Sequence, residues 1–135
     1  MVRMDLSQIV INDTSSEQVI VLKERDGHRS FSILIGIPEA MAIDRAINER
    51  RTLRPLTHDL LNSVLENLNV ELERVVISDL RDKTFYGKLM LVRDGETIEV
   101  DSRPSDAIAL AALRDTPLYV EERVLRQVCK ADDLT

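Results

Sequence analysis

The sequence predicts a single α+β domain, spanning residues 1–135, with a mostly antiparallel sheet and three principal helices. A chain of 135 residues has the length of one domain. The predicted elements follow the order strands, two helices, strands and a helix, which differs from the regular alternation that builds parallel sheets. Two Asp-Gly pairs, Asp26-Gly27 and Asp94-Gly95, separate β-rich runs, as hairpin turns do.

The first half of the chain is expected to contain three strands and two helices. The strands are the β-rich runs Leu6–Ile11, Val19–Leu22 and Phe31–Ile35. The first helix begins at 36–39, because Pro38 suits the first helical position, and it ends near Arg50 and Arg51. The second helix begins at Thr57, which we predict as its N-cap.

The second half is expected to form a sheet and one buried helix. Its strands are Val70–Leu80, Thr84–Val92, Thr97–Val100 and the short Leu118–Val120. The third helix follows Pro104, and its run Ala107–Leu113 is apolar on every side, as in buried helices. A last helix is expected to cover Glu122–Val128.

Apolar periodicity predicts the residues of the core. They are Val64, Leu65, Leu68, Phe85, Leu89, Ile108 and Ala111. Several long strands have edges that need covering, and the domain is small for its apolar content. We therefore predict a homo-oligomer built from dimers.

The composition argues against several classes of protein. The net charge of −6 opposes nucleic-acid binding by bulk electrostatics, although a local basic patch is compatible with it. Two Phe and two Tyr residues are too few for a stacking platform for single strands. The lone Cys129 forms no internal disulfide, and no apolar run reaches the ~18 residues of a membrane span. The prediction is a cytoplasmic protein without membrane contacts.

Two segments have the residue types of a catalytic site. Each places an Arg-Pro pair at a helix start, with hydroxyl and carboxylate side chains in the first turn: Arg54-Pro55-Leu56-Thr57-His58-Asp59 and Asp101-Ser102-Arg103-Pro104-Ser105-Asp106. Helix N-termini attract anions, and arginine binds phosphate with two parallel hydrogen bonds. We expect the two segments to converge on one cleft.

The chemistry suggested by these segments is phosphate-directed. Asp59, Asp101 and Asp106 are candidate ligands for Mg²⁺ or Mn²⁺, because these cations prefer carboxylate oxygens. With His58 as a general base, they make up the predicted catalytic set. The predicted phosphate-binding residues are Arg54, Thr57, Arg103 and Ser105. Glu39 is an additional carboxylate at a helix start. No organic cofactor is implied, because Gly-rich phosphate loops and dinucleotide fingerprints are absent.

The same residues also have a purely structural interpretation. First-turn carboxylates and hydroxyl groups stabilise helix starts, and Arg103 can pair with Asp101 or Asp106. A cluster of basic side chains, Arg45, Arg50, Arg51 and Arg54, either seats a phosphate backbone or ends a helix. From composition and spacing alone, both interpretations stay open.

Three stretches together resemble the bifunctional nuclease family, a domain long catalogued in bacteria and also found in plants. They are Arg54–Leu61, then Asp79-Leu80 with Thr84–Tyr86, then Val100–Ala111, of which Arg103–Ala107 is the most specific. The similarity runs from the helix start at 36–39 to the strand at Pro117. Their order and spacing along the chain carry the resemblance.

The resemblance implies an α+β domain with nuclease activity on DNA and RNA. Nucleic acid is then the expected partner and a divalent cation the expected cofactor. Many family members carry a small C-terminal helical module, which is expected to be absent here because the sequence stops at Thr135. The leading functional hypothesis is phosphodiester hydrolysis. The alternative is a non-catalytic, oligomeric binding or regulatory module.

Overall fold

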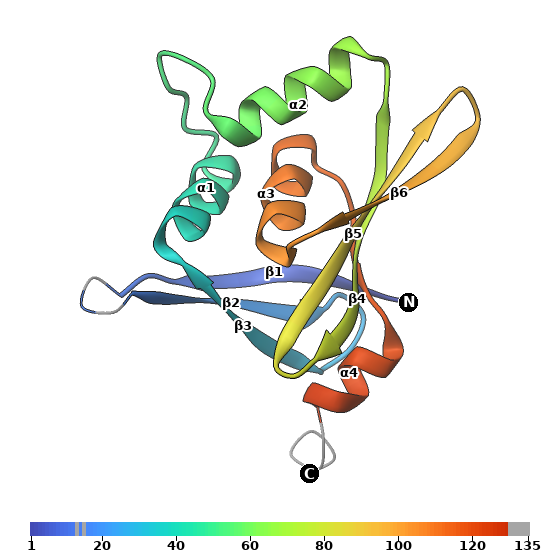
Figure 1. The fold of residues 1–135 in the computed structure, drawn as a ribbon. Coiled ribbons are helices and arrows are strands. Elements are labelled where there is room, and N and C mark those ends of the chain that lie inside the picture. The colour runs from blue at the N-terminus through green and yellow to red at the C-terminus, as the bar shows by residue number, and fades with distance from the viewer. Residues whose placement is uncertain (13, 15, 130–135) are drawn as a thin grey trace.

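The fold is known from a computed structural model that describes residues 1–12, 14 and 16–129. Within these residues the elements follow the order β1 (Val2–Val10), β2 (Glu17–Glu24), β3 (Ser30–Gly36), α1 (Ile37–Ile47), α2 (Thr57–Asn67), β4 (Glu71–Arg81), β5 (Thr84–Arg93), β6 (Glu96–Ser102), α3 (Pro104–Arg114), β7 (Leu118–Val120) and α4 (Glu122–Val128) (Figure 1). Among the described residues, none of the helices combines the length and the hydropathy of a membrane span.

All the described strands belong to one sheet, in the order β3-β2-β1-β7-β4-β5-β6. Neighbouring strands are antiparallel except for β4 and β7, which run parallel. The α+β class is confirmed, but the sheet is mixed and the described residues form four helices rather than the predicted three. The difference arises because α3 returns the chain across the sheet, so that β7 inserts beside β4 in the same direction.

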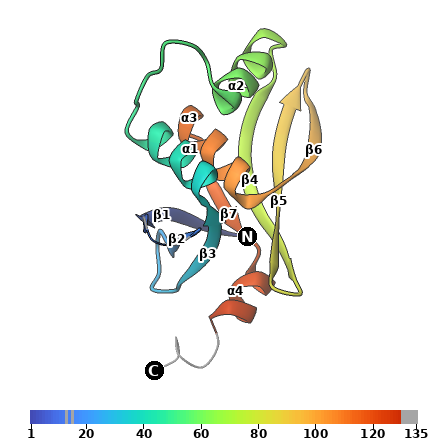
Figure 2. The same ribbon diagram turned by 60° about the vertical axis from the view of Figure 1, so that its left-hand side comes forward.

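The sheet has two halves that run in different directions. Strands β1, β2 and β3 cross the line of β4, β5 and β6, and β7 lies where the halves meet (Figures 1 and 2). Helices α1, α2 and α3 gather on one side, with α4 at the other end of the molecule. The tight turn from β5 to β6 has left-handed backbone at both Asp94 (φ 50°) and Gly95 (φ 79°), as the Asp-Gly pair predicts.

Helix α3 is the central element of the core. Its residues Ala107, Ile108, Ala109, Leu110 and Ala111 are all buried, in agreement with its uniformly apolar sequence. It packs between α1 and α2 and against strands β4 and β5. Because α3 is fixed on several sides, the residues at its N-terminus have a rigid support.

The core prediction is correct for four of the seven residues. Leu65, Leu89, Ile108 and Ala111 are buried, and the half-buried Phe85 lies with its ring centre 5.5 Å from that of Phe31. Val64 and Leu68 were predicted incorrectly, since their side chains are 43% and 51% exposed. The cause is the orientation of α2.

Helix α2 turns a partly polar face toward the rest of the domain. The side chain of Asn62 accepts a 2.7 Å hydrogen bond from Arg114 of α3, and Leu65 is the one buried residue of α2. This orientation leaves Leu60, Leu61 and Val64 on the outer side. Periodicity identifies an apolar face on a helix, but it does not say whether that face meets the same chain.

Candidate active site at three helix starts

The first turns of α1, α2 and α3 meet around one cleft of about 1070 Å³. The walls come from these helices and from strands β5 and β6. The polar residues that line the cleft are Glu39, Arg45, Thr57, His58, Asp101, Ser102, Arg103 and Asp106. We call this space the site cleft. It brings together side chains from both segments that the sequence singles out.

At the centre of the site cleft, the Asp106 carboxylate makes polar contacts with His58 and Arg103. His58 Nε2 lies 2.9 Å from Asp106 Oδ1. Arg103 donates from Nε to Asp106 Oδ2 at 2.8 Å and from Nη2 to Oδ1 at 3.2 Å. Arg103 Nη1 is 3.9 Å from Glu39 Oε1. Asp106 therefore joins α2 to the start of α3, and Arg103 extends the contact to α1.

The environment keeps Asp106 ionised. Burial raises its pKa, but the hydrogen bonds from Arg103 and His58 and their nearby charges outweigh burial, so the net pKa is lower than usual. The same hydrogen bonds act on the other partner, so that Asp106 raises the pKa of Arg103. Asp106 also lies in the first turn of α3, where the helix dipole favours negative charge.

This ion pair should make part of the stability depend on pH. Because the folded pKa of Asp106 is lowered, its contribution is complete above the unfolded value of about 3.9 and is lost as pH falls through the folded value. We expect Asp106→Asn to lose less unfolding free energy than wild type between about pH 5 and pH 2 in urea titrations. Asp79 and Glu122 also have lowered pKa values. Both residues are present in wild type and in the variant, so their contributions to the pH dependence cancel in the comparison. Parallel pH profiles for the two proteins would contradict this prediction.

The structure brings most, but not all, of the predicted residues together. His58, Asp101, Arg103, Asp106 and Thr57 line the site cleft. Thr57 is the first helical residue rather than the N-cap, and Leu56 occupies the cap position. The cap is completed by a carboxylate, that of Asp59, and no hydroxyl takes part.

Two residues of the predicted set do not line the site cleft itself. The Asp59 carboxylate accepts a 2.9 Å hydrogen bond from the backbone N–H of Leu56, and Asp59 shares a small gap beside the cleft with His58 and Arg45. Arg54 lies in the exposed loop before α2 and is also outside the lining of the cleft. Among the described residues, no group of three or more His, Cys, Asp or Glu side chains could hold a metal ion.

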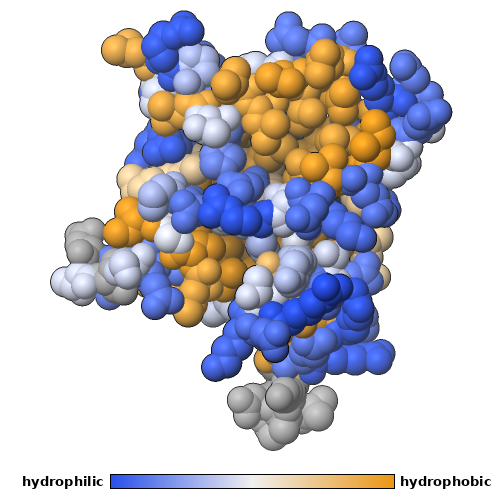
Figure 3. Space-filling view, in the orientation of Figure 1, coloured by the Kyte–Doolittle hydropathy of each residue, from blue (hydrophilic) through white to orange (hydrophobic). Residues whose placement is uncertain are grey.

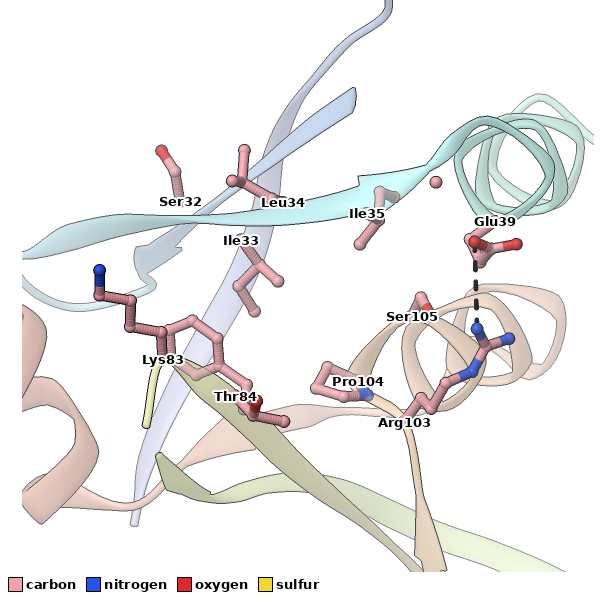
Figure 4. A pocket seen from close by; sticks show the side chains of 12 residues that line it. Ser32, Ile33, Leu34, Ile35, Glu39, Lys83, Thr84, Arg103, Pro104 and Ser105 are labelled. Carbon is pink, nitrogen blue, oxygen red and sulfur yellow. Dashed lines mark ion pairs between the residues drawn. The ribbon is translucent and has the colours of Figure 1, made fainter. Parts of the chain in front are cut away.

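A second pocket of about 520 Å³ adjoins the site cleft. Figure 4 shows Ser105 and Pro104 between the start of α1 and the β4–β5 turn, with Lys83 on the opposite wall. The ion pair of Arg103 with Glu39 borders both spaces. Ser105 is buried and lines this adjoining pocket rather than the site cleft. Glu39, which the sequence offered only as an additional carboxylate, thus lines both spaces and pairs with Arg103.

Strand β5 has a close approach beneath the site. A Cβ atom on Gly87 would lie 3.0 Å from the carbonyl oxygen of Ser102 and 3.5 Å from the Cα of Pro104. Glycine therefore lets the turn into α3 pack directly on β5. This contact fixes the backbone on which Arg103 is mounted.

Arginine side chains gather beside the site cleft. A neighbouring pocket of about 620 Å³ is lined by Arg45, Arg50 and Arg51 together with Asp59. Arg45 borders this pocket and the site cleft. Arg50 is paired with Asp44 at 2.8 Å. The basic concentration seen in the sequence therefore lies next to the predicted site, although Arg54 is not in the lining of this pocket.

A family model of the bifunctional nuclease domain matches residues 20–132. The chain belongs to the bifunctional nuclease domain family. The match includes both helix-start segments and all the elements from β3 to α4. The family resemblance inferred from the three motif stretches is therefore confirmed.

Relatives of this bifunctional nuclease domain occur in bacteria and plants. An uncharacterized protein of Mycobacterium tuberculosis (strain ATCC 25618 / H37Rv) is 40% identical over 119 residues, covering 88% of this chain and 71% of its own length. Bifunctional nuclease 1 of Oryza sativa subsp. japonica is 29% identical over 119 residues, and Bifunctional nuclease 2 is 26% identical over 115 residues. The match covers 84% and 82% of this chain, but only 36% and 35% of the two rice proteins.

Proposed function

We propose that the site cleft hydrolyses phosphodiester bonds in DNA and RNA. The observation that carries the proposal is the His58–Asp106–Arg103 contact chain, which joins residues 48 positions apart in one cleft. A base, the carboxylate that orients it and a phosphate-binding cation are the parts that hydrolysis of a phosphodiester needs. Membership of the bifunctional nuclease domain family supports the same reaction.

In this proposal His58 moves the proton of the attacking water. Asp106 holds His58 through Nε2, and Nδ1 has no hydrogen bond to the described residues. The imidazole thus has one oriented nitrogen and one available nitrogen. Arg103, whose side chain is largely exposed, directs Nη1 toward Glu39 and the cleft, where it would bind a phosphate oxygen. Thr57, which lines the same cleft, would add a hydroxyl donor.

The proposal includes a divalent cation, Mg²⁺ or Mn²⁺. Mg²⁺ is commonly bound by one or two carboxylates together with substrate phosphates and water. Asp101 is exposed and lines the same cleft as Asp106. Both oxygens of Asp106 are bonded to His58 and Arg103, so Asp101 would be the first ligand of the ion, and Asp106 would join it only by releasing one of these partners. When bound, the cation would supply a positive charge that stabilises the developing negative charge on the phosphate. Asp59 does not fit this pair, because it caps its own helix.

The nucleic-acid backbone would run from the site cleft over Arg45, Arg50 and Arg51. These side chains continue the cleft on the α1 side. Local cations can bind phosphates even in a chain with a net charge of −6, because the Debye length is about 8 Å at physiological salt. Substrate affinity should therefore fall with added salt.

The proposal is tested with Arg103→Ala and Asp106→Asn in highly purified protein. Single- and double-stranded DNA and RNA are incubated with Mg²⁺, with Mn²⁺ or with chelator. We expect each substitution to lower cleavage at least about tenfold, because it removes phosphate binding or the orientation of the base. The readout is product formed per mole of folded protein, with folding checked by circular dichroism.

A matched Arg–Asp pair elsewhere provides the control. Arg25 donates to Asp5 from Nε at 3.1 Å and from Nη2 at 2.8 Å, and neither residue lines the site cleft. Arg25→Ala and Asp5→Asn should cleave like wild type. Equal cleavage by all five proteins would indicate a contaminating nuclease, and no cleavage by wild type on any substrate would also overturn the proposal.

A non-catalytic regulatory module is the rival function. It is favoured by the fact that both oxygens of Asp106 are already bonded within the protein, so that the site could simply fasten α2 to α3. In that case wild type would have no nuclease activity of its own, and the only effect of Asp106→Asn would be a lower melting temperature. The same protein preparations therefore separate the two functions.

A further inference from the structure

The pocket of about 520 Å³ beside the site cleft, which we call the adjoining pocket, has no role in the proposed reaction. Its volume is within the range of about 300–1,000 Å³ that is typical of small-molecule sites. Its walls come from β3, from the start of α3 and from the beginning of β5 (Figure 4). In Figure 3 apolar side chains gather over β3, and hydrophilic side chains border them above and toward the β4–β5 turn. The adjoining pocket is therefore an apolar recess with polar edges.

The inner walls of the adjoining pocket are apolar and include one aromatic ring. Ile33 and Ile35 occupy alternate positions of β3, so their side chains are on the same side of the sheet. Phe85 of β5 and Pro104 of α3 also line the pocket. Every nucleobase has a π face that stacks on aromatic side chains. These walls therefore suit a flat heterocycle such as a base.

One buried polar side chain of the adjoining pocket is without a partner. Ser105 is only 6% exposed, and its hydroxyl forms no hydrogen bond with the described residues. Figure 4 shows the Ser105 side chain on the face of α3 that is directed toward β3. Buried polar groups of proteins are ordinarily hydrogen-bonded. A ligand with a polar edge would supply the partner that Ser105 lacks.

Cationic side chains lie on opposite sides of the adjoining pocket. Arg103 lines both this pocket and the site cleft, and Lys83 lies on the other wall (Figure 4). The backbone of Lys83 is left-handed, with φ 68°, in a tight turn where glycine or asparagine is usual. Lys83 forms no ion pair with the described residues. A nucleotide within a chain has a phosphate on each side of its sugar, so it matches two separated cations.

Glu39 adds a hydrogen-bond acceptor to the adjoining pocket. Its carboxylate lines the pocket and lies 3.9 Å from Arg103, which is longer than a direct hydrogen bond. Adenine, cytosine and guanine each have an exocyclic amino group that donates hydrogen bonds, whereas thymine has none. A carboxylate at this place therefore favours a base with an amino group.

We propose that the adjoining pocket binds the base of one unpaired nucleotide of the substrate, while Arg103 binds the phosphate next to that nucleotide. The inference rests on the proposed function, because it takes Arg103 as a phosphate ligand. The amino group of the base would donate to Glu39, its polar edge would contact Ser105, and Lys83 would bind the second phosphate. A base in a duplex must leave the stack before it can enter a pocket. The substrate class is therefore single-stranded or locally unpaired DNA and RNA.

Binding is tested by isothermal titration calorimetry of the full chain in the presence of chelator. The probe is adenosine 3′,5′-bisphosphate, which has one base and a phosphate on each side of the sugar. Fructose 1,6-bisphosphate, a sugar with two phosphates and no base, is the comparison ligand. We expect the adenosine probe to have a Kd at least about tenfold lower, because base stacking adds to its affinity. Equal Kd values, or no binding of the adenosine probe, would overturn the proposal.

Matched variants show whether the probe occupies the adjoining pocket. Lys83→Gln and Ser105→Ala should each raise the Kd of the adenosine probe at least about threefold, because each removes a contact with the ligand. Lys88→Gln removes the same charge from β5 outside the pocket. Ser78→Ala removes a buried hydroxyl that already donates to a backbone carbonyl. Both controls should bind like wild type, and equal effects in pocket and control variants would contradict the assignment.

Cleavage of a modified oligonucleotide gives a second measurement that needs no variant. In a single-stranded substrate with one abasic nucleotide, one phosphodiester bond beside that nucleotide should be cut at least about tenfold more slowly than beside adenine, because the base contact is lost. The distant bonds of the same strand should be cut as before. Uniform cleavage along the strand would overturn the base pocket and leave the nuclease function in place. A wild type that binds the adenosine probe but cleaves no substrate would overturn the nuclease function and leave the base pocket in place.

Discussion

Replacing His58 with asparagine is expected to lower kcat on both DNA and RNA by about 10²- to 10⁴-fold, the usual contribution of a general acid or base. Asparagine can still donate a hydrogen bond toward Asp106, which His58 contacts at 2.9 Å. The helix start and the ion pair with Arg103 should therefore remain in place. Single-turnover cleavage, with the protein in saturating excess over the substrate, measures the chemical step directly, because it excludes product release.

The second histidine of the chain provides the control. His28 is exposed in the connection between β2 and β3, remote from the site cleft, so His28→Asn should keep full activity. An active His58→Asn protein would assign the proton transfer to another group. In contrast, a loss of binding with unchanged kcat would make His58 a substrate-positioning residue.

Truncating Leu110 to alanine is expected to cost about 2–5 kcal/mol of unfolding free energy, the range for leucine in a closed core. Leu110 is fully buried at the middle of α3, and α3 packs against α1, α2, β4 and β5. A cavity at this position has little freedom to collapse, since elements on several sides hold it open. Urea denaturation of Leu110→Ala and wild type measures the difference.

An exposed leucine gives the comparison for this substitution. Leu34→Ala on β3 removes the same atoms from a side chain that is 63% exposed, and it should change stability by less than about 0.5 kcal/mol. A cost for Leu110→Ala below about 1 kcal/mol would mean that α3 is less tightly packed than the structure shows.

The local elements could largely be predicted from sequence, because their signals are local. Pro38 and Pro104 mark helix starts, and Asp94 with Gly95 marks a hairpin turn. The place of β7 between β1 and β4 could not be predicted, because pairing partners are set by tertiary packing. For the same reason, periodicity found the apolar stripe of α2 but not the side of the domain to which it points.

Asp59 and Asp106 show the limit of site prediction most clearly. Both occupy the third position of a helix, and both segments contain an Arg-Pro pair. The Asp59 carboxylate bonds the backbone of Leu56, whereas that of Asp106 bonds His58 and Arg103. The sequence identifies two equivalent carboxylates. Only the three-dimensional position of α2 relative to α3 decides which of them faces the cleft.

The central place of β7 has a consequence for the order of folding. Its three residues pair with β1 on one side and with β4 on the other, so the first and second halves of the sheet join through a strand near the end of the chain. During synthesis, the hairpins β1–β2–β3 and β4–β5–β6 emerge earlier and can form from local contacts. The seam between them closes only when Val120 has left the ribosome, which makes this step the long-range and therefore slow part of folding.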